Sequence, residues 1–219
     1  MLTWLKPAPV RRGGAPDLAQ VITTAIEIAD EEGLPAVSMR RIAAALRSGT
    51  ASLYRILESR EEILDRMVDV VLGEALPPVA TGDWRADLTA VARNRRALML
   101  RHAWLGPELS GRPSLGPNAL THHERTLAAA AGLTDDPTAA SSAVETLLAY
   151  VLGAVARETA ETQTRQRTPD EVYPYLQQVI DGYPHLRRMV HEAEDFGPDD
   201  RFERGLACVL DGIGAQSGA

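Results

Sequence analysis

The chain has 219 residues, a formal net charge of −7 and one cysteine, Cys208. A single cysteine excludes an internal disulfide and a cysteine-rich zinc site, which suits a reducing cytoplasm. No run approaches the roughly 18 apolar residues of a membrane span, and the proline-broken opening MLTWLKPAPV does not resemble a signal peptide. We therefore predict a soluble cytoplasmic protein with no membrane partner.

The first 16 residues contain Lys6, Arg11 and Arg12 among prolines and glycines, without a periodic apolar face. This composition predicts a flexible basic arm over residues 1–16. Two interpretations stay open: the arm reaches DNA phosphates or a minor groove, or it is a disordered terminus whose charges are incidental.

Residues 17–64 have the pattern of three helices and the start of a fourth. Apolar residues recur at helical spacing from Leu18 until Gly33 ends the first helix. Ser38 can cap a short second helix, the turn Arg47–Gly49 interrupts it, and Thr50 can cap a third. Two short helices joined by a tight turn are typical of a helix-turn-helix domain. Ser59 then caps a longer helix, whose residues 65–76 are predicted to link this domain to the next.

Positive charge is concentrated in the same stretch. Between Gly33 and Arg60 there are five arginines and one acid, Glu58, so this stretch carries a net +4. Such a patch in an acidic protein is typical of a nucleic-acid contact. The alternative is that these arginines only solvate the outer face of the helices.

Residues 83–215 are predicted to form a second helical domain. Asp83 and Asn118 can cap helices, the pair Asp136–Pro137 can open a third, and Thr168–Glu171 has the spacing of a capping box. A short helix from Pro184 follows, and Asp199 or Asp200 can cap the last helix. The helix after Pro137 is apolar over much of its circumference, which predicts deep burial. Because no window alternates as a strand does, we predict an all-α chain of about nine or ten helices.

Between the helix from Trp84 and the helix from Asn118 lies material for a small-molecule pocket, with apolar walls and a few polar groups. Taken singly, most of these side chains fit a core position equally well. For the adjacent histidines His122 and His123 we predict one buried and one exposed ring. An interior arginine would need an anion, or an acid such as Glu108, beside it. The candidate residues are Val91, Arg95, Met99, His102, Trp104, Glu108, Arg112, His122 and Leu148. No metal or cofactor is indicated.

The run from Leu18 to Leu72, with its segments SLYRIL and SREEILDRMVDVVL, resembles the DNA-binding domain of the tetracycline-repressor-like (TetR) family of bacterial transcriptional regulators. The segments DWRADL and FERGLACVLDGI resemble that family's effector domain more loosely. The resemblance implies a ligand-responsive repressor with two sets of DNA contacts. Base edges would be faced by Arg40, Thr50, Ala51, Ser52 and Arg55, and phosphates would be held by Ser38, Tyr54 and Arg60.

A helix-turn-helix protein that reads a palindromic operator needs two recognition helices, so we expect a homodimer on double-stranded DNA. The resemblance places the dimer interface on the helices around 143–156 and 202–213; the alternative is that both stripes face their own core. A small-molecule effector would release the DNA by moving the linking helix at 65–76.

Departures from the family pattern limit what the resemblance implies. Glu108 stands where the tetracycline repressor has a histidine that helps to hold the drug's magnesium, so the effector is not obviously tetracycline and no metal is implied. In the DNA-reading stretch, Arg47 replaces a common glycine and Ile56 an often-found histidine. Arg47 must therefore adopt a left-handed backbone at some cost, or the turn differs.

Catalytic motifs are missing from the sequence. There is no G-x-S-x-G elbow, phosphate loop or H-E-x-x-H pattern. We therefore predict that the chain is not an enzyme, with a helical enzyme or a protein-interaction adaptor as the alternative functions.

Overall fold

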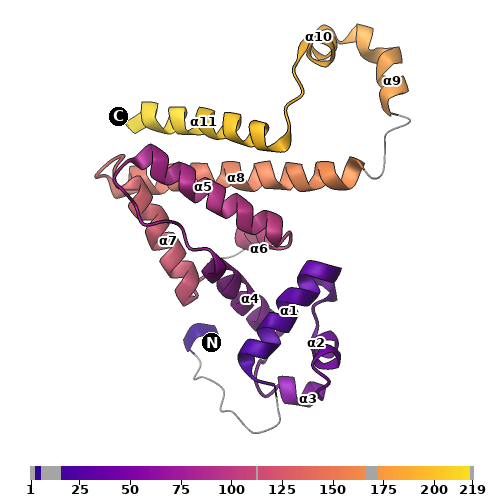
Figure 1. Ribbon diagram of the computed structural model, residues 1–219, viewed down its shortest axis with the longest axis vertical. Coiled ribbons are helices and arrows are strands. Elements are labelled where there is room, and N and C mark those ends of the chain that lie inside the picture. The colour runs from indigo at the N-terminus through magenta and orange to yellow at the C-terminus, as the bar shows by residue number, and fades with distance from the viewer. Residues whose placement is uncertain (1–2, 6–15, 112, 166–171, 218–219) are drawn as a thin grey trace.

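The computed structural model describes residues 3–5, 16–111, 113–165 and 172–217 (Figure 1). These residues contain helices and no strands, which confirms the all-α class; eleven α-helices were found where nine or ten were expected. The helices are α1 (Leu18–Glu32), α2 (Met39–Ala45), α3 (Thr50–Leu53), α4 (Arg60–Glu74), α5 (Trp84–Arg101), α6 (Leu105–Gly111), α7 (Pro117–Ala130), α8 (Pro137–Arg165), α9 (Val172–Val179), α10 (Pro184–Glu192) and α11 (Pro198–Ser217). Short 3-10 segments lie at Thr3–Leu5, Leu34–Ala36 and Ile180–Gly182.

Side-chain caps fix where several helices begin. Ser38 accepts from the Arg41 amide, Ser59 from the Glu62 amide and Asp83 from the Ala86 amide. Each of these bonds satisfies an N–H that has no partner within its helix. The expected cap residues of α2, α4 and α5 are thereby confirmed.

Three predicted caps were wrong. Helix α11 begins at Pro198, so Asp199 and Asp200 lie inside its first turn. Thr50 is the first residue of α3, and the cap position belongs to Gly49. Helix α7 begins at Pro117 after Gly116, so Asn118 lies inside the first turn. Proline is well suited to the first helical position because it has no N–H to satisfy. The predicted capping box Thr168–Glu171 lies within 166–171, outside the described residues.

Helix α4 belongs to two packing units. It packs against α1 in the lower part of the molecule and against α7 above (Figure 1). Its buried residues Ile63 and Leu64 join the core of α1–α3, together with Leu53 and Leu57, whereas Val71 and Leu72 continue toward the larger bundle. A displacement of α4 therefore acts on both units.

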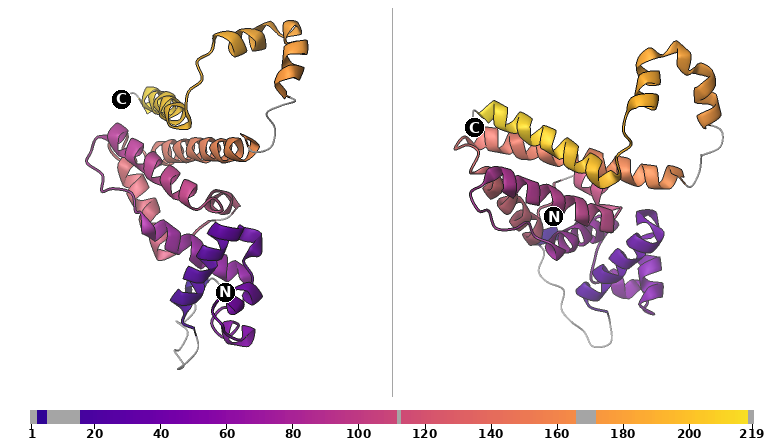
Figure 2. Two further views of the ribbon diagram at one scale, coloured as in Figure 1. Left: turned by 45° about the vertical axis from the view of Figure 1, so that its right-hand side comes forward. Right: turned by 45° about the horizontal axis from the view of Figure 1, so that its top comes forward.

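The larger unit is a bundle of α5, α7, α8 and α11, with α11 lying along α8 (Figures 1 and 2). Leu88, Leu98, Leu147 and Leu206 are completely or almost completely buried in its core. Between α8 and α11 the chain projects from the bundle as an arm formed by α9, the 3-10 segment Ile180–Gly182 and α10 (Figure 2). Helix α10 has no buried residue.

Helix α8 corrects two predictions. Pro137–Glu161 has a mean hydropathy of 1.5 and is, among the described residues, the one helix long and apolar enough to cross a bilayer, yet only 28% of its apolar window is buried within the chain. Helix α8 is therefore not deeply buried in this chain. By length and composition it also contains a stretch that could span a membrane, which the sequence was predicted to lack. Its outward face carries the small residues Ala149, Gly153, Ala156 and Ala160. Periodicity predicted the apolar stripe, but it does not reveal what covers it.

Part of the N-terminal arm is ordered against α4. Thr3 Oγ1 donates to an Asp65 oxygen at 2.9 Å, and the Arg66 guanidinium lies 5.5 Å from the Trp4 ring centroid. This packing differs from the expectation of a wholly flexible arm. Lys6, Arg11 and Arg12 lie outside the described residues.

Candidate nucleic-acid interface and effector pocket

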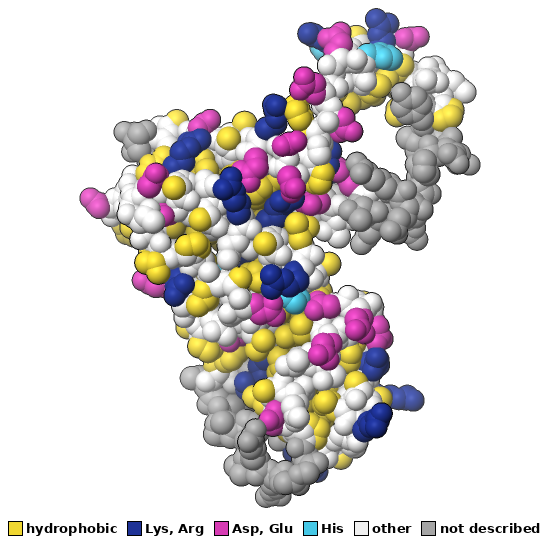
Figure 3. Space-filling view, in the orientation of Figure 1, with side chains coloured by type: hydrophobic (Ala, Val, Ile, Leu, Met, Phe, Trp, Pro, Cys, Tyr) yellow, Lys and Arg dark blue, Asp and Glu magenta, His cyan; other side chains and the backbone are white. Residues whose placement is uncertain are grey.

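Helix α3 presents a polar outer face. Leu53 is completely buried and anchors the helix, while Ala51, Tyr54 and Arg55 are exposed and Thr50 and Ser52 are half-buried. Arg55 Nη2 donates to Ser52 Oγ at 3.0 Å, so the two side chains lie together on this face. Arg40 is exposed on the preceding helix, α2. Dark-blue side chains lie over α2 at the outer edge of this unit (Figure 3).

The turn between α2 and α3 is made by a left-handed arginine. Arg47 has φ 49°, the one non-glycine residue with positive φ in the described chain. Such a backbone costs an L-residue roughly 1–2 kcal/mol relative to the right-handed region. The Arg47 and Ser48 amides donate to the carbonyls of Ala44 and Ala43, which holds the turn. Of the two outcomes expected for this position, the left-handed backbone is therefore the one found.

The five arginines of this stretch have different surroundings. Arg41 is paired with Glu32 at 2.5 Å, which neutralises it. The guanidinium of Arg60 donates to the carbonyls of Leu34 and Val37 at 3.1 and 3.3 Å, so part of its hydrogen-bonding capacity holds the loop before α2. The other three, Arg40, Arg47 and Arg55, form no salt bridge to an acid in the described part of the chain. These three remain available to phosphates or bases.

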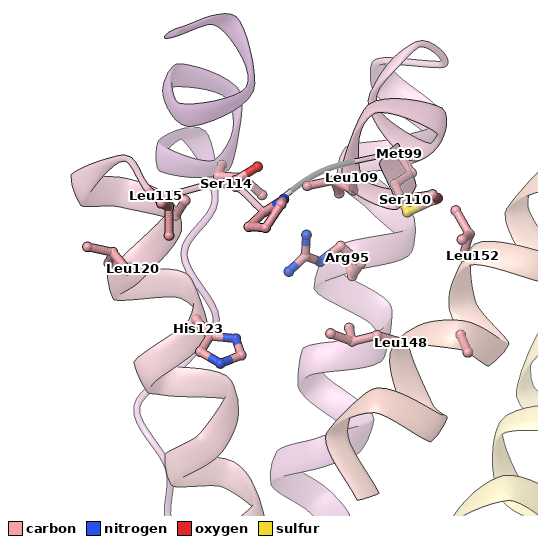
Figure 4. Close-up of a pocket in the computed structure, with 14 residues that line it drawn as sticks. Arg95, Met99, Leu109, Ser110, Ser114, Leu115, Leu120, His123, Leu148 and Leu152 are labelled. Carbon is pink, nitrogen blue, oxygen red and sulfur yellow. The ribbon is translucent and has the colours of Figure 1, made fainter. Parts of the chain in front are cut away.

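The second site is a partly open cavity of about 430 Å³ lined by α4, α5, α6, α7 and α8 (Figure 4). Three of the nine predicted pocket residues line it: Arg95, Met99 and Leu148. Sequence reasoning missed the rest of the lining, and three of these residues, Pro113, Ser114 and Leu115, follow α6 in a proline- and glycine-rich run that carries no helical periodicity. The lining residues that were missed are Leu72, Leu109, Ser110, Pro113, Ser114, Leu115, Ala119, Leu120, His123, Ala149 and Leu152.

Two predicted pocket residues instead join the two packing units. His102 is buried, with Nδ1 2.9 Å from Asp30 on α1 and Nε2 3.1 Å from Glu74 on α4. Trp104 Nε1 donates to the same Asp30 carboxylate at 2.7 Å. These residues lie where α5 ends and turn toward α1, away from the cavity. Their placement in the pocket was wrong because α5 ends at His102, and the carboxylates of Asp30 and Glu74 hold both side chains at the contact with α1 and α4.

The remaining predictions fall in several places. Val91 is part of the core, and Glu108 lies on α6 outside the pocket lining, where it has a partner of its own. Arg112 is outside the described residues. His122 is completely buried behind Arg95, while His123 is exposed and lines the cavity, which confirms the expected buried and exposed pair.

Arg95, which is half-buried, and His122, which is completely buried, form a polar pair. Arg95 Nη2 lies 3.1 Å from His122 Nδ1. Arginine can only donate, so Nδ1 accepts and the imidazole is neutral with its proton on Nε2. Burial, helped by the charge of Arg95, lowers the pKa of His122 to about 3, and burial lowers the pKa of Arg95 to about 10. Arg95 Nε and His122 Nε2 are buried without a hydrogen-bond partner.

The pocket is connected directly to α4. Leu72 of α4 lines the cavity, and Asp69, one turn earlier, accepts from the Ala119 amide at 2.9 Å and from Asn118 Nδ2 at 3.3 Å. A carboxylate is favoured at the start of α7 by the helix dipole. A Cβ on Gly116 would lie 2.1 Å from an Asp69 oxygen, so this close approach requires glycine. Movement of the segment Pro113–Leu115, which leads into α7, would therefore reach α4.

No group of three or more histidine, cysteine, aspartate or glutamate side chains is placed to hold a metal ion in the described residues. None of the described residues that line the cavity carries a carboxylate. Within the described lining, the walls are mainly apolar and carry one cation, two serine hydroxyls and an imidazole.

Comparison with known proteins places both sites in context. Residues 76–217 match the family described as "Tetracyclin repressor-like, C-terminal domain". The HTH-type transcriptional repressor DrrR1 of Streptomyces coeruleorubidus is 38% identical over 228 residues, covering 97% of this chain and 83% of that protein. The class A tetracycline repressor of transposon 1721 from Escherichia coli is 26% identical, covering 88% of each chain.

Among solved structures, that of ActR from Streptomyces coelicolor in complex with actinorhodin superimposes with a TM-score of 0.76. Its sequence identity is 31%, and the match covers 92% of this chain and 98% of that one. The same protein in its apo form gives a TM-score of 0.77 at 30% identity. The likeness thus extends over the helix-turn-helix unit as well as the larger bundle.

Proposed function

Since this chain belongs to the tetracycline-repressor-like family of ligand-responsive helix-turn-helix transcriptional regulators, we propose that it is a cytoplasmic homodimeric repressor that a small molecule releases from a palindromic operator. The observation that carries the proposal is the pairing of an exposed, partly unpaired arginine face on α2–α3 with an apolar cavity whose wall includes α4. A regulator needs both features and a connection between them.

The proposed DNA contacts follow from exposure. Arg40 and Arg55 are free to face base edges, where arginine bonds guanine bidentately, and Thr50, Ala51 and Ser52 surround Arg55 on the same face. Ser38 and Tyr54 are proposed to hold phosphates. Arg60 is assigned a mixed role, because its carbonyl contacts order the loop before α2.

The proposed dimer uses the outward faces of α8 and α11. Ala149, Gly153, Ala156 and Ala160 of α8 are exposed in the single chain, as are Cys208, Gly212 and Ala215 of α11. An apolar helix of this length is stable in water only if another surface covers it. A second copy related by a two-fold axis would do so and would bring two α3 helices to one operator.

The proposed release mechanism is a population shift. An effector in the cavity contacts Leu72 directly and reaches Asp69 through the start of α7. It favours a position of α4 in which the spacing of the two α3 helices no longer fits successive grooves, provided that it binds this state better.

Selection of bound duplexes from random DNA tests the proposed function. We expect enrichment of an inverted repeat whose half-sites are about one helical turn or a multiple of it apart, roughly 34–36 Å per turn. Enrichment of an asymmetric site, or of none, would contradict the proposal. Repeating the selection with Arg55→Ala should relax the preference at the base that Arg55 faces.

A further inference from the structure

Arg95 differs from its neighbours on α5 in having no acidic partner. Arg93 forms a two-bond pair with Glu203 at 2.8 Å, and Arg96 contacts Glu158 and Asp199 at 2.9 and 2.6 Å. No carboxylate of the described residues forms a salt bridge with Arg95, whose hydrogen-bonding neighbour is the neutral ring of His122. The least solvated arginine of this helix is therefore the one left without an anion.

The position of Arg95 indicates that a ligand bound in the cavity could supply the missing anion. Its side chain leaves the middle of α5 and points into the cavity, toward the space between Ser114 and His123 (Figure 4). It is the one charged side chain among the fourteen that line the pocket. A guanidinium in an apolar enclosure is strongly favoured by a carboxylate or phenolate that can accept two parallel hydrogen bonds.

The rest of the lining restricts the remainder of the ligand. Met99, Leu109, Leu148 and Leu152 form apolar walls around Arg95, and Ser110 already donates its hydroxyl proton to the Gly106 carbonyl. Such walls favour a largely apolar body, and the cavity of about 430 Å³ admits a body of fused rings. A ligand with a basic group at the depth of Arg95 would instead meet like charge.

From this geometry we propose that the effector is an organic acid: an apolar, ring-based molecule whose single anionic oxygen group pairs with Arg95. This inference rests on the proposed function only in that the cavity is taken to be the effector site. His122 acts as the positioning residue, since its Nδ1 holds one edge of the guanidinium and leaves the other N–H groups to the ligand.

The test uses the full-length protein and a matched pair of probes, 2-naphthoate and its neutral analogue 2-naphthamide, in a buffer free of carboxylates. Calorimetric titration should give a preference for the acid of at least about tenfold in Kd, because only the acid forms the charge-assisted pair. Arg95→Met should reduce the ratio to about one, and Arg95→Lys, which retains the charge without the two-bond geometry, should retain part of it.

Arg93→Met is the matched control, because it removes the same charge from the same helix outside the pocket; it should retain the preference for the acid. Melting temperatures establish that each variant is folded. For Arg95→Met the melting temperature without probe should be at least that of the parent, since an unpaired buried cation is removed. A clear loss would assign Arg95 a structural role instead.

Equal binding of the two probes, binding of neither, or a preference that survives Arg95→Met would overturn the inference. Binding of the parent protein to duplexes selected from random DNA is measured alongside. If operator binding is found without acid preference, the effector class is wrong and the proposed function stands. If acid preference is found without any operator, the proposed function is wrong and the effector class stands as the ligand class of this cavity.

Discussion

The two candidate sites use arginine in opposite environments. Arg40 and Arg55 stand in water on the surface of α2 and α3, where a guanidinium is solvated and salt weakens its attraction to other charges. Arg95 lies in an apolar cavity with a neutral histidine beside it. Exposed arginines can contact a long polyanion at many points with modest energy each, whereas a buried arginine favours one anionic group strongly and rejects neutral analogues.

The two units also differ in how completely they are closed. The core of α1–α3 and the start of α4 is small and covered, whereas the larger bundle keeps a cavity inside and an uncovered apolar face on α8. The first unit is built to keep one shape. The second can change its contacts with a ligand and with another chain.

The largest effect is expected from the closed unit. Leu53→Ala removes the completely buried anchor of α3. We expect a loss of about 2–5 kcal/mol in unfolding free energy, together with loss of operator binding. Urea denaturation and DNA binding measure the two effects; a stable protein with full operator affinity would show that α3 does not depend on this core.

The uncovered face predicts an effect on assembly. Gly153→Glu places a charge on the outer face of α8, where a Cβ meets no atom within 4 Å in the single chain. Loss of the dimer should reduce operator affinity by about 100-fold, since two linked contacts become one. Sedimentation velocity and DNA titration test this. Ala128→Glu, at an exposed position of α7, is the control, and an intact Gly153→Glu dimer would place the interface elsewhere.

The buried pair in the pocket predicts acid sensitivity. The pKa of His122 is about 3 in the folded chain and 6.5 in the unfolded chain, so below pH 6.5 the unfolded state binds the extra proton and stability falls as pH falls. Between pH 7 and pH 5 this contribution is about 2 kcal/mol. His122→Asn should flatten this part of the curve of unfolding free energy against pH, whereas His123→Asn should not. Equal curves for the two variants would contradict the assignment.

The exposed arginines predict a loss specific to DNA. Arg55→Ala should weaken operator binding by about 1–3 kcal/mol without lowering the melting temperature. Arg187→Ala, which changes the same charge on the projecting arm, should leave operator affinity unchanged. Anisotropy titrations compare the two variants; equal losses would indicate a nonspecific effect of net charge.

The smallest effect concerns the turn. Arg47→Gly removes the left-handed strain of an L-residue at φ 49° but gives the unfolded chain more freedom. The balance should be a stabilisation of up to about 1 kcal/mol, measured by urea denaturation. A destabilisation would show that the Arg47 side chain makes contacts worth more than the strain.

The helix-turn-helix unit could be predicted from local signals. Caps at Ser38 and Ser59, the apolar spacing around Ile42 and the misfit of Arg47 each depend on a few neighbouring residues, and the structure contains all of them. The pocket depends on chain direction and distant contacts. Arg95 was found because an interior arginine is unusual, while His102 and Trp104 were misplaced because the break after α5 turns them toward α1.

The apolar face of α8 shows a different limit. Its composition predicted burial, and the single chain leaves it largely uncovered. Hydrophobic periodicity records that a face must be covered, but it cannot distinguish a partner chain from the chain's own core. Likewise, the segment Pro113–Leu115 has no periodicity, so nothing in its sequence indicates that it lines a cavity.

The most direct test joins the two arginine environments in one measurement. A small-molecule extract of the cells that encode the protein is separated by charge, and each fraction is added to the full-length protein bound to its selected operator. Release of the labelled duplex by the acidic fraction is the predicted result, because an anion at Arg95 would act through Leu72 and Asp69 on the spacing of the α3 helices. Release by neutral or basic fractions alone, or by none, would contradict the account.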